Sequence, residues 1–414
     1  MLSPPSGGAA YAGLVPRLSL PRLTNIRRLP RDVLVLGVIA FFVMVGFGVV
    51  VPVLPVYVRS FGVGYLEIGA VVSAFALMRF VASPFCGRLI DWLGERTLLA
   101  IGIGIVALSS ALVGLAGSYV EILLLRGAGG IGSAMFTVSA MTLLLRSTPA
   151  SSRGRSVGFY QGGFLLGGMA GPAIGGVLAT VSLTAPFFFY AGTLAVAGLV
   201  GLVLLQRGAV EDSGAPAPAE LPLRSVLRDP RFRAACLANF ANGWTSLGVR
   251  SALIPVLVVE VLSGTAAWTG AAFAIAAVVQ TIALGPAGRF VDTVGRKPAI
   301  LGAYTVAAAT ILAISIAPNF AILTVLLCVY GIAAAFMGTA PAAAVGDATA
   351  GARGGRPVAV FSMTSDLGAI AGPLVAGWLV DVASFPAAFG VAAVFLLIAA
   401  LSALRMPREA PPAE

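Results

Sequence analysis

Long apolar runs constrain this sequence more than any other feature, because each is long enough to cross a lipid bilayer as a helix. An α-helix rises about 1.5 Å per residue, so about 20 apolar residues cross a hydrocarbon core of roughly 30 Å. Charged residues make up 10% of the chain, against roughly 25% in soluble domains. We therefore predict an all-α integral membrane protein with twelve transmembrane helices. The predicted spans are 33–58, 66–86, 97–117, 120–145, 156–180, 185–206, 234–262, 267–288, 298–317, 320–345, 357–381 and 385–405.

A short charged segment, called the knot below, occurs twice. The first copy reads GRLIDWLGER at 87–96, and the second reads GRFVDTVGRK at 288–297, 201 residues later. Each follows the second long apolar run of its half, which indicates two related halves. The second glycine of each knot suits a tight reversal between helices, and the aspartate can cap a helix or pair with an arginine. We predict a conformational latch formed by Gly87, Asp91, Gly94, Arg96, Gly288, Asp292, Gly295 and Arg296.

The latch aspartates need basic partners close to the same membrane surface. Arg146, Arg153 or Arg155 are the expected partners of Asp91. Arg353 or Arg356 are those of Asp292. Exposed ion pairs are worth only about 0 to 1 kcal/mol each, so such a latch biases a two-state equilibrium without locking it.

The repeat extends beyond the knots and predicts the domain organisation. The Gly-Pro pair at 171–172 recurs at 372–373, again 201 residues later. The polar stretch 207–233 is rich in proline and reads as a linker between two bundles. Parallel halves of this kind suggest an alternating-access transporter with its site between them. The predicted domains are a disordered basic tail at 1–32, a six-helix bundle at 33–206, the linker at 207–233, a second six-helix bundle at 234–405 and a tail at 406–414.

Basic residues predict the orientation of the chain. With twelve spans and both termini inside, 22 of the 26 Lys and Arg residues fall in the tails and the even-numbered loops, and such loops stay cytoplasmic. We predict a multi-pass protein of a bacterial inner membrane with both termini in the cytoplasm. The net charge of +10 is spread over many short loops, so it does not predict nucleic-acid binding.

No enzyme-like motif is present in the sequence. It has no histidine, no phosphate-binding loop and three cysteines without metal-ligand spacing. We therefore predict no catalytic residue, no metal site, no cofactor and no direct use of ATP.

Three motifs resemble those of a known family. The knots resemble the loop 2–3 signature of the major facilitator superfamily, and LRGAGGIG at 125–132 resembles its span 4 motif with a buried arginine. GGMAGPAIGG at 167–176 is similar to the span 5 antiporter motif of the twelve-span drug:proton efflux branch. The resemblance covers about 31–405 and implies two pseudo-symmetric six-helix bundles that export a substrate. Many members of that branch have an acidic residue in span 1, whereas 33–58 contains none, so proton coupling requires another acid.

Glycines at 163, 167, 171 and 175 recur every four residues and therefore line one face of span 5. Such a face lets another helix approach closely, and Pro172 adds a kink. Tight packing without a transport role is the alternative. The predicted hinge comprises Gly167, Gly171, Pro172, Gly175 and Gly176.

Charged residues inside a bilayer are costly and are usually functional. Arg79, Arg126, Arg250 and Asp366 lie deep in predicted spans. Glu67, Glu260 and Asp381 are close enough to loops to be merely solvated. The resemblance places spans 2 and 11 side by side, so we predict an ion pair between Arg79 and Asp366 that holds the cytoplasmic side closed until Asp366 is protonated. Glu121, near the outer end of span 4, is the next candidate for proton coupling.

The predicted substrate cavity combines deep charges, amides and aromatic rings. Its residues are Arg126, Arg250, Asn239, Asn242, Trp244, Gln280 and Phe164. The deep charges sum to plus two, and desolvated guanidinium groups bind carboxylate or phosphate well. Anionic or zwitterionic amphiphiles therefore remain open beside cationic drugs.

These features predict a monomeric, proton-coupled efflux transporter of hydrophobic or amphipathic small molecules that works by alternating access. Its partners are then the lipid bilayer, protons and the small-molecule substrate. A proton-coupled importer of a metabolite is the first alternative, because the repeat alone does not set direction. A non-transporting membrane receptor or assembly factor is the second.

Overall fold

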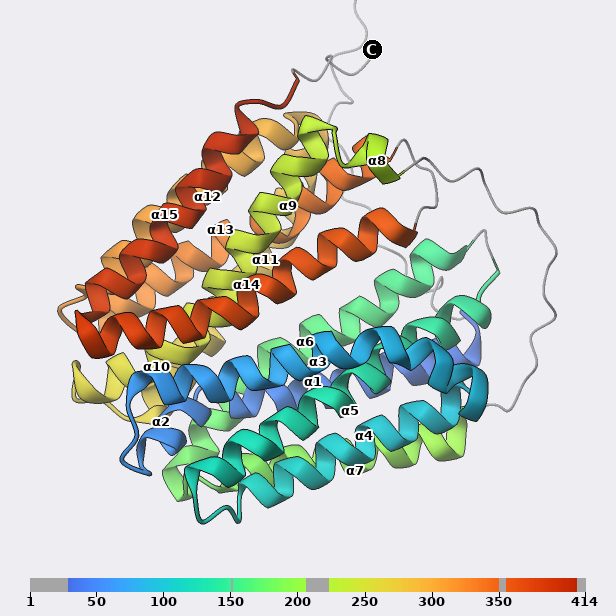
Figure 1. The fold of residues 1–414 in the computed structure, drawn as a ribbon, viewed down its shortest axis with the longest axis horizontal. Coiled ribbons are helices and arrows are strands. Elements are labelled where there is room, and N and C mark those ends of the chain that lie inside the picture. The colour runs from blue at the N-terminus through green and yellow to red at the C-terminus, as the bar shows by residue number, and fades with distance from the viewer. Residues whose placement is uncertain (1–28, 150–151, 206–222, 350–354, 408–414) are drawn as a thin grey trace, which may run out of the picture.

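The computed structural model describes residues 29–149, 152–205, 223–349 and 355–407, which are helical almost throughout (Figure 1). The predicted tail at 1–32 and linker at 207–233 lie largely outside the described residues. The first half contains α1 (Arg31–Val50), α2 (Leu54–Arg59), α3 (Tyr65–Leu93), α4 (Glu95–Val113), α5 (Tyr119–Arg146), α6 (Arg153–Val181) and α7 (Ala185–Leu204). The second contains α8 (Leu223–Val226), α9 (Pro230–Asn242), the π-helix η3 (Gly243–Val249), α10 (Arg250–Glu260), α11 (Ala266–Thr293), α12 (Arg296–Ile314), α13 (Phe320–Ala348), α14 (Gly355–Val382) and α15 (Phe385–Ala403).

Each half is a helical bundle with its own apolar core. In the first half α1 packs on α6 and α7, while α5 packs on α3 and α4. In the second half α13 packs on α11 and α12, and α9 packs on α13, α14 and α15. The halves meet where α14 lies along α3 and α11 lies along α6 (Figure 1). The predicted fold class, an all-helical membrane protein of two bundles, is confirmed.

Eleven of the described helices are long and apolar enough to cross a membrane. The twelfth predicted span, 234–262, is also helical, but it is divided into α9, η3 and α10, each shorter than 18 residues. At the start of α10, the Ser251 hydroxyl donates to the carbonyl of Ser246 in η3, five residues earlier (3.2 Å). π-Helical turns inside helices are rare and occur frequently at functional sites.

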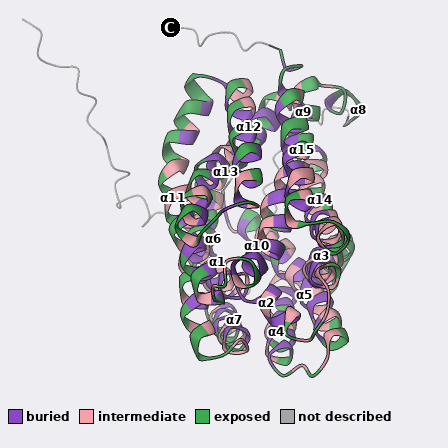
Figure 2. Cartoon of the chain, turned by 90° about the vertical axis from the view of Figure 1, so that its left-hand side faces the viewer, coloured by how far each residue is buried: buried purple, intermediate pink, exposed green. Residues whose placement is uncertain are grey.

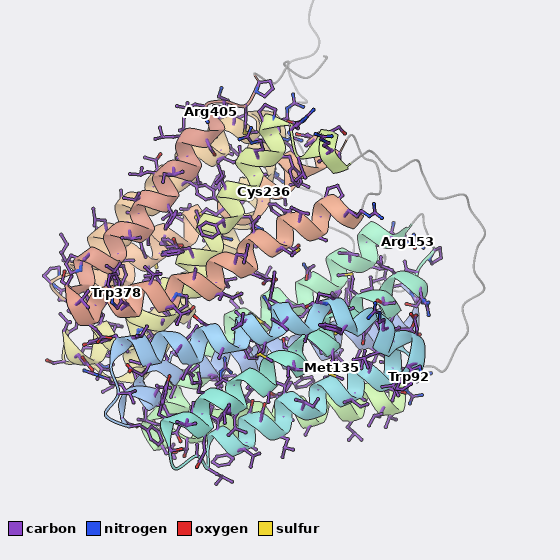
Figure 3. The ribbon with its side chains drawn as sticks, viewed as in Figure 1. Trp92, Met135, Arg153, Cys236, Trp378 and Arg405 are labelled. Carbon is purple, nitrogen blue, oxygen red and sulfur yellow. The ribbon has the colours of Figure 1, made fainter. Side chains whose placement is uncertain are left out.

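The knots form the reversals that the sequence predicts. Gly94 and Gly295 have φ values of +78° and +115° between consecutive helices, a conformation that glycine adopts without the steric cost of a side chain. Figure 3 places Trp92 and Arg153 at one end of the bundle and Trp378 at the other. We call the first the linker end, because residues 205 and 223 flank the linker there, and the other the closed end.

Helices α1 and α6 approach each other at backbone distance. A Cβ atom added at Gly167 would lie 2.5 Å from the carbonyl oxygen of Phe41, and one at Gly175 would lie 2.3 Å from that of Val49. At Gly171 it would meet the Cα of Gly48 at 2.7 Å. By contrast, Gly162 on the same helix faces open space. The glycine face predicted in span 5 therefore packs on α1.

We expect Gly167→Ala and Gly175→Ala to destabilise the protein, because the added methyl group meets backbone atoms that move only if the two helices separate. Overpacking of this kind costs about 1 to 3 kcal/mol. The apparent melting temperature of the purified protein in detergent should fall for both variants. Gly162→Ala is the matched control and should leave it unchanged or slightly higher. Equal behaviour of all three variants would contradict the close packing.

Candidate functional site

An ion pair joins the two halves at the closed end. Arg59 Nε lies 2.7 Å from Glu260 Oε1, and the Tyr65 hydroxyl donates to the same carboxylate. The Arg59 guanidinium also stacks over the Tyr65 ring, 4.6 Å from its centroid. Arg59 is the last residue of α2 and Glu260 is the last residue of α10, so the pair joins corresponding regions of the two halves. Figure 2 looks onto this end, with α2 and α10 at its centre.

Asp381 forms a second link at the same end. Its carboxylate accepts hydrogen bonds from the backbone N–H groups of Tyr65 (3.0 Å) and Leu66 (2.8 Å) at the start of α3. A carboxylate is favourable there because the first N–H groups of a helix have no partner within it and carry partial positive charge. The interpretation of Glu260 and Asp381 as merely solvated is therefore wrong.

Contacts between α3 and α14 continue from the closed end to the middle of the bundle. A Cβ atom at Gly69 would lie 2.2 Å from the carbonyl oxygen of Pro373. One turn further in, the Ser73 hydroxyl donates to the carbonyl of Ile370 (2.7 Å). These contacts bring the two backbones together over the outer part of both helices.

The predicted ion pair between Arg79 and Asp366 is present, with Arg79 Nη2 bonded to Asp366 Oδ1. Its side chains are 33% and 24% exposed, so the pair is partly desolvated. It lies further from the closed end than the α3–α14 contacts above, and beyond it the halves diverge toward the linker end (Figure 1). The pair is formed while the halves diverge at the linker end, and its predicted role in holding the cytoplasmic side closed stays a prediction.

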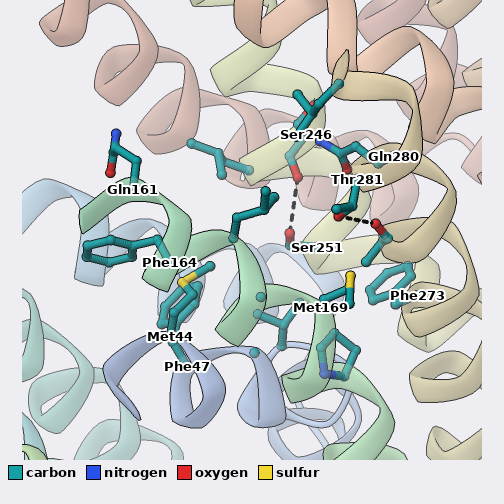
Figure 4. A pocket seen from close by; sticks show the side chains of 18 of the residues that line it. Met44, Phe47, Gln161, Phe164, Met169, Ser246, Ser251, Phe273, Gln280 and Thr281 are labelled. Atoms are coloured by element: carbon teal, nitrogen blue, oxygen red, sulfur yellow. Dashed lines mark hydrogen bonds between the residues drawn. The ribbon is translucent and has the colours of Figure 1, made fainter. Parts of the chain in front are cut away.

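The main cavity lies between the halves and has a volume of about 610 Å³. Ligand pockets for drug-sized molecules are roughly 300 to 1,000 Å³, so a small molecule fits. Figure 4 shows Met44, Phe47, Phe164 and Met169 on the side of the first half, facing Phe273 and Gln280 from the second. The wall extends to Gly158, close to the start of α6 at the linker end.

A smaller pocket of about 110 Å³ adjoins the main cavity. Both are lined by Phe47, Val51, Leu247 and Ser251. Arg79 and Arg126 also line the smaller pocket, whereas Arg250 lines the main cavity. Among the described residues, no aspartate or glutamate lines either space.

Arg126 is 8% exposed, and its guanidinium stacks over the Phe75 ring at 4.5 Å. Arg250 lies over the rings of Phe273 and Tyr330, at 5.3 and 5.7 Å. The Nε atoms of both arginines are buried without a hydrogen-bond partner among the described residues. Neither arginine forms an ion pair in that part of the chain. Among the described residues, both cations therefore lie against aromatic rings and have no counter-charge.

The remaining predicted cavity residues have other positions. Gln280 and Phe164 line the main cavity, whereas Asn239, Asn242 and Trp244 line neither pocket. Asn239 donates to the carbonyl of Phe361. Asn242 accepts from Ser246. Trp244 packs on Phe240 and Phe395.

Glu121 caps a helix instead of facing the cavity. Its carboxylate accepts from the backbone N–H of Gly117 (2.8 Å), and the Ser118 hydroxyl accepts from the backbone N–H of Glu121 (3.3 Å). The Ser-x-x-Glu spacing at 118–121 is the sequence signature of such a capping box, so the sequence contained the signal for this structural role.

The knots carry ion pairs other than those predicted. Arg146 pairs with Glu95, not with Asp91, and Arg296 Nε lies 2.9 Å from Asp347 Oδ2. Glu95 and Arg296 are equivalent under the 201-residue repeat, as are Arg146 and Asp347, so the second half has the same link with its charges exchanged. Both pairs lie within one half. Asp91 and Asp292 are exposed and form no ion pair with a described residue; Arg353, a predicted partner, lies outside the described residues.

Several cavity residues were missed at the sequence level. Met44, Phe47, Met169 and Phe273 read as ordinary apolar span residues, and only their positions in the assembled halves expose them to the cavity. Ser246 and Ser251 flank the end of the π-helical segment, which no local pattern indicated. No group of three or more metal-ligating side chains occurs in the described ranges.

With two bundles around a central cavity, the chain has the architecture of a membrane transporter. It belongs to the Major Facilitator Superfamily, whose model matches residues 36–262 and 235–414. It is therefore a secondary transporter of this superfamily and not an enzyme.

Two curated proteins are similar to this chain in sequence. The quinolone resistance protein NorA of Staphylococcus aureus is 31% identical over 175 residues, which are 42% of this chain and 45% of the relative. The match thus spans less than half of that relative. The uncharacterized MFS-type transporter MJ1560 of Methanocaldococcus jannaschii is 23% identical over 387 residues, 92% of this chain and 100% of the relative.

Solved structures share the fold. A bacterial homolog of the human lysosomal transporter Spinster, in an inward-facing and unoccupied conformation, aligns with a TM-score of 0.73 and 16% identity over 90% of this chain and 95% of that one. The human organic anion transporter MFSD10 aligns with a TM-score of 0.64 and 22% identity over 90% and 99%.

We expect Asp381→Ala to accelerate hydrogen exchange at the start of α3, because the amides of Tyr65 and Leu66 lose their acceptor. Hydrogen bonds to charged groups contribute about 1.5 to 3 kcal/mol, which corresponds to exchange about tenfold faster or more. Exchange measured by mass spectrometry on peptides that cover 64–72 checks this. Glu67→Gln, which changes a neighbouring carboxylate, is the control and should have little effect. If both variants exchange like the wild type, Asp381 does not close this end.

Proposed function

We propose that this protein is a proton-driven exporter that moves hydrophobic or amphipathic small molecules out of a bacterial cell. The observation that carries this proposal is the cavity between the two halves, which is largely apolar, extends toward the linker end and is shut off at the closed end. A binding site reached from one side of the membrane at a time is the requirement of alternating access.

The distribution of basic residues supports a cytoplasmic position for the linker end. Both knots lie there, and the first copy contains Arg88 and Arg96. The closed end has Arg59, which is paired with Glu260. Because basic loops stay on the cytoplasmic side, the cavity then faces the cytoplasm, from which an exporter collects its substrate.

The likeness to NorA supports export over import. That protein is named for quinolone resistance, and the span 5 motif at 167–176 resembles that of the efflux branch. The aligned region covers less than half of NorA, so the direction of transport needs its own experiment.

Asp366 is the proposed proton-binding group. It is bonded across the interface between halves to Arg79, and protonation of a carboxylate removes most of its attraction to a guanidinium. The ionised pair stabilises the state in which the closed end is shut, and protonation of Asp366 weakens that state. A change of charge on one side chain thereby shifts the equilibrium between two conformations.

Pro172 provides a bending point beside the cavity. It lies in the cavity wall within α6, and its ring removes a backbone donor from the middle of that helix. A Cβ atom at Gly270 of α11 would meet the carbonyl oxygen of Pro172 at 2.6 Å. The two halves therefore touch at the hinge, where a small bend of α6 separates them.

We expect inside-out vesicles with an acidified interior to accumulate a quinolone, because protons leaving the vesicle drive substrate in. Uptake followed by fluorescence should collapse when a protonophore is added. Uptake that ignores the gradient would contradict proton coupling. Uptake only in right-side-out vesicles with an acidic exterior would support the importer instead, and an absence of transport in either orientation would support a receptor.

Asp366→Asn should abolish gradient-driven uptake while the protein remains folded, because an amide does not take up the coupling proton. The variant should also open more often at the closed end, which hydrogen exchange at 64–72 reports. The sequence alone predicted the opposite, that loss of the ion pair opens the cytoplasmic side. Asp229→Asn is the control, since Asp229 caps α9 outside the cavity and asparagine caps helices equally well. If Asp366→Asn transports with an unchanged pH profile, Asp366 is not the coupling group.

A further inference from the structure

The charge of the cavity walls points to one class of substrate. A permanently cationic drug would need an anionic partner to offset the loss of its hydration, yet no described aspartate or glutamate lines the main cavity or the smaller pocket. Asp366, the deep carboxylate, is bonded to Arg79. The charges that face the two spaces are the guanidinium groups of Arg79, Arg126 and Arg250.

Arg126 and Arg250 lack the partners that buried cations need. Leaving a buried charge without a counter-charge or hydrogen bonds is costly, and Arg126 is 8% exposed. The Nε–H groups of both arginines have no acceptor in the described part of the chain. The aromatic rings contact one face of each guanidinium, and no described residue accepts a hydrogen bond from the Nε–H edge. These edges are suited to a carboxylate, which guanidinium binds through two parallel hydrogen bonds.

The two spaces differ in size, so the smaller suits the charged head group of an amphipathic ligand and the larger suits its apolar body. The pocket at Arg126 has about 110 Å³, less than the roughly 300 to 1,000 Å³ of pockets that hold drug-sized molecules, so it suits a carboxylate head group better than a drug-sized body. The main cavity of about 610 Å³ accommodates the body. Phe47 and Val51 line both spaces, and Arg250 adjoins Ser251, which also lines both.

We propose that the site binds amphipathic monoanions, with the carboxylate at Arg126 in the smaller pocket, Arg250 beside the junction and the apolar body in the main cavity. This assignment rests on the proposed transport function only for the choice of cavity. Its test measures binding, which needs no proton gradient. A failure of export would therefore leave it standing, and a failure of binding would leave proton-driven export standing.

The test compares three probes with the same ring system. The carboxylate 1-naphthaleneacetate, the neutral 1-naphthaleneacetamide and the cation (1-naphthylmethyl)trimethylammonium are titrated calorimetrically into the protein in lipid nanodiscs, with empty nanodiscs as the blank. The carboxylate should bind at least tenfold more tightly than the other two, because it alone satisfies the free N–H groups. Equal or tighter binding of the cation would overturn the proposal.

Arg126→Gln should weaken binding of the carboxylate about tenfold or more and change binding of the amide by less than about twofold. Arg250→Gln should weaken the carboxylate in the same direction. Arg88→Gln is the matched control, because Arg88 is exposed and lines neither space. Unchanged binding of the carboxylate in Arg126→Gln would overturn the assignment.

Thermal stability separates this role from a structural one. Arg126 is a buried cation without a partner, so Arg126→Gln without ligand should melt at the same temperature as the wild type or higher, and 1-naphthaleneacetate should stabilise it less. A large fall in melting temperature without ligand would show that Arg126 holds the bundle together instead. If Arg126→Gln does not fold, Arg126→Lys keeps the charge and loses the planar fork. That variant should bind the carboxylate more weakly than the wild type, and unchanged binding would contradict the two-bond geometry.

Discussion

The cost of charge inside a bilayer governs this structure. A charged side chain within a span is stable only if it is paired, hydrogen-bonded or directed into a polar space. Arg79 and Asp366 satisfy this requirement by pairing across the interface between halves. Arg126 and Arg250 satisfy it only in part, through aromatic rings. Three of these four residues are arginines, and their surroundings separate the paired Arg79 from Arg126 and Arg250.

Charge also organises the two ends, in a pattern set by the internal repeat. At the closed end, Arg59 at the end of α2 pairs with Glu260 at the end of α10, so this contact joins corresponding regions of the two halves. At the linker end, the pair of Glu95 with Arg146 recurs in the second half with exchanged charges, as Arg296 with Asp347. Those pairs stay inside one half. Ion pairs therefore link the two halves at the closed end and join helices within each half at the linker end.

Close packing of helix backbones stabilises the contacts between helices that no ion pair holds. Little hydrophobic force drives helices together in lipid, so small residues that allow close approach stabilise their association. The α1–α6 contact depends on this through Gly167, Gly171 and Gly175. Across the second half, η3 packs in the same way on α14, since a Cβ atom at Gly243 would lie 2.0 Å from the carbonyl oxygen of Ser365. The π-helical segment and the cavity beside it thus depend on glycine packing as well as on the position of Arg250.

By itself, the sequence determined the spans, the two related halves and the glycine reversals at 94 and 295, because apolar length and repeat offset are local quantities. Helical rise placed Arg79 and Asp366 at similar depths, but their pairing was predicted only with the neighbourhood of spans 2 and 11 that the family resemblance implies. It did not determine that Glu260 and Asp381 close one end, or that Asn239 and Trp244 turn away from the cavity. These outcomes depend on how the bundles are rotated and tilted against each other. A polar residue in a span can face either its own bundle or the space between bundles, and only the packed tertiary structure decides between these two environments.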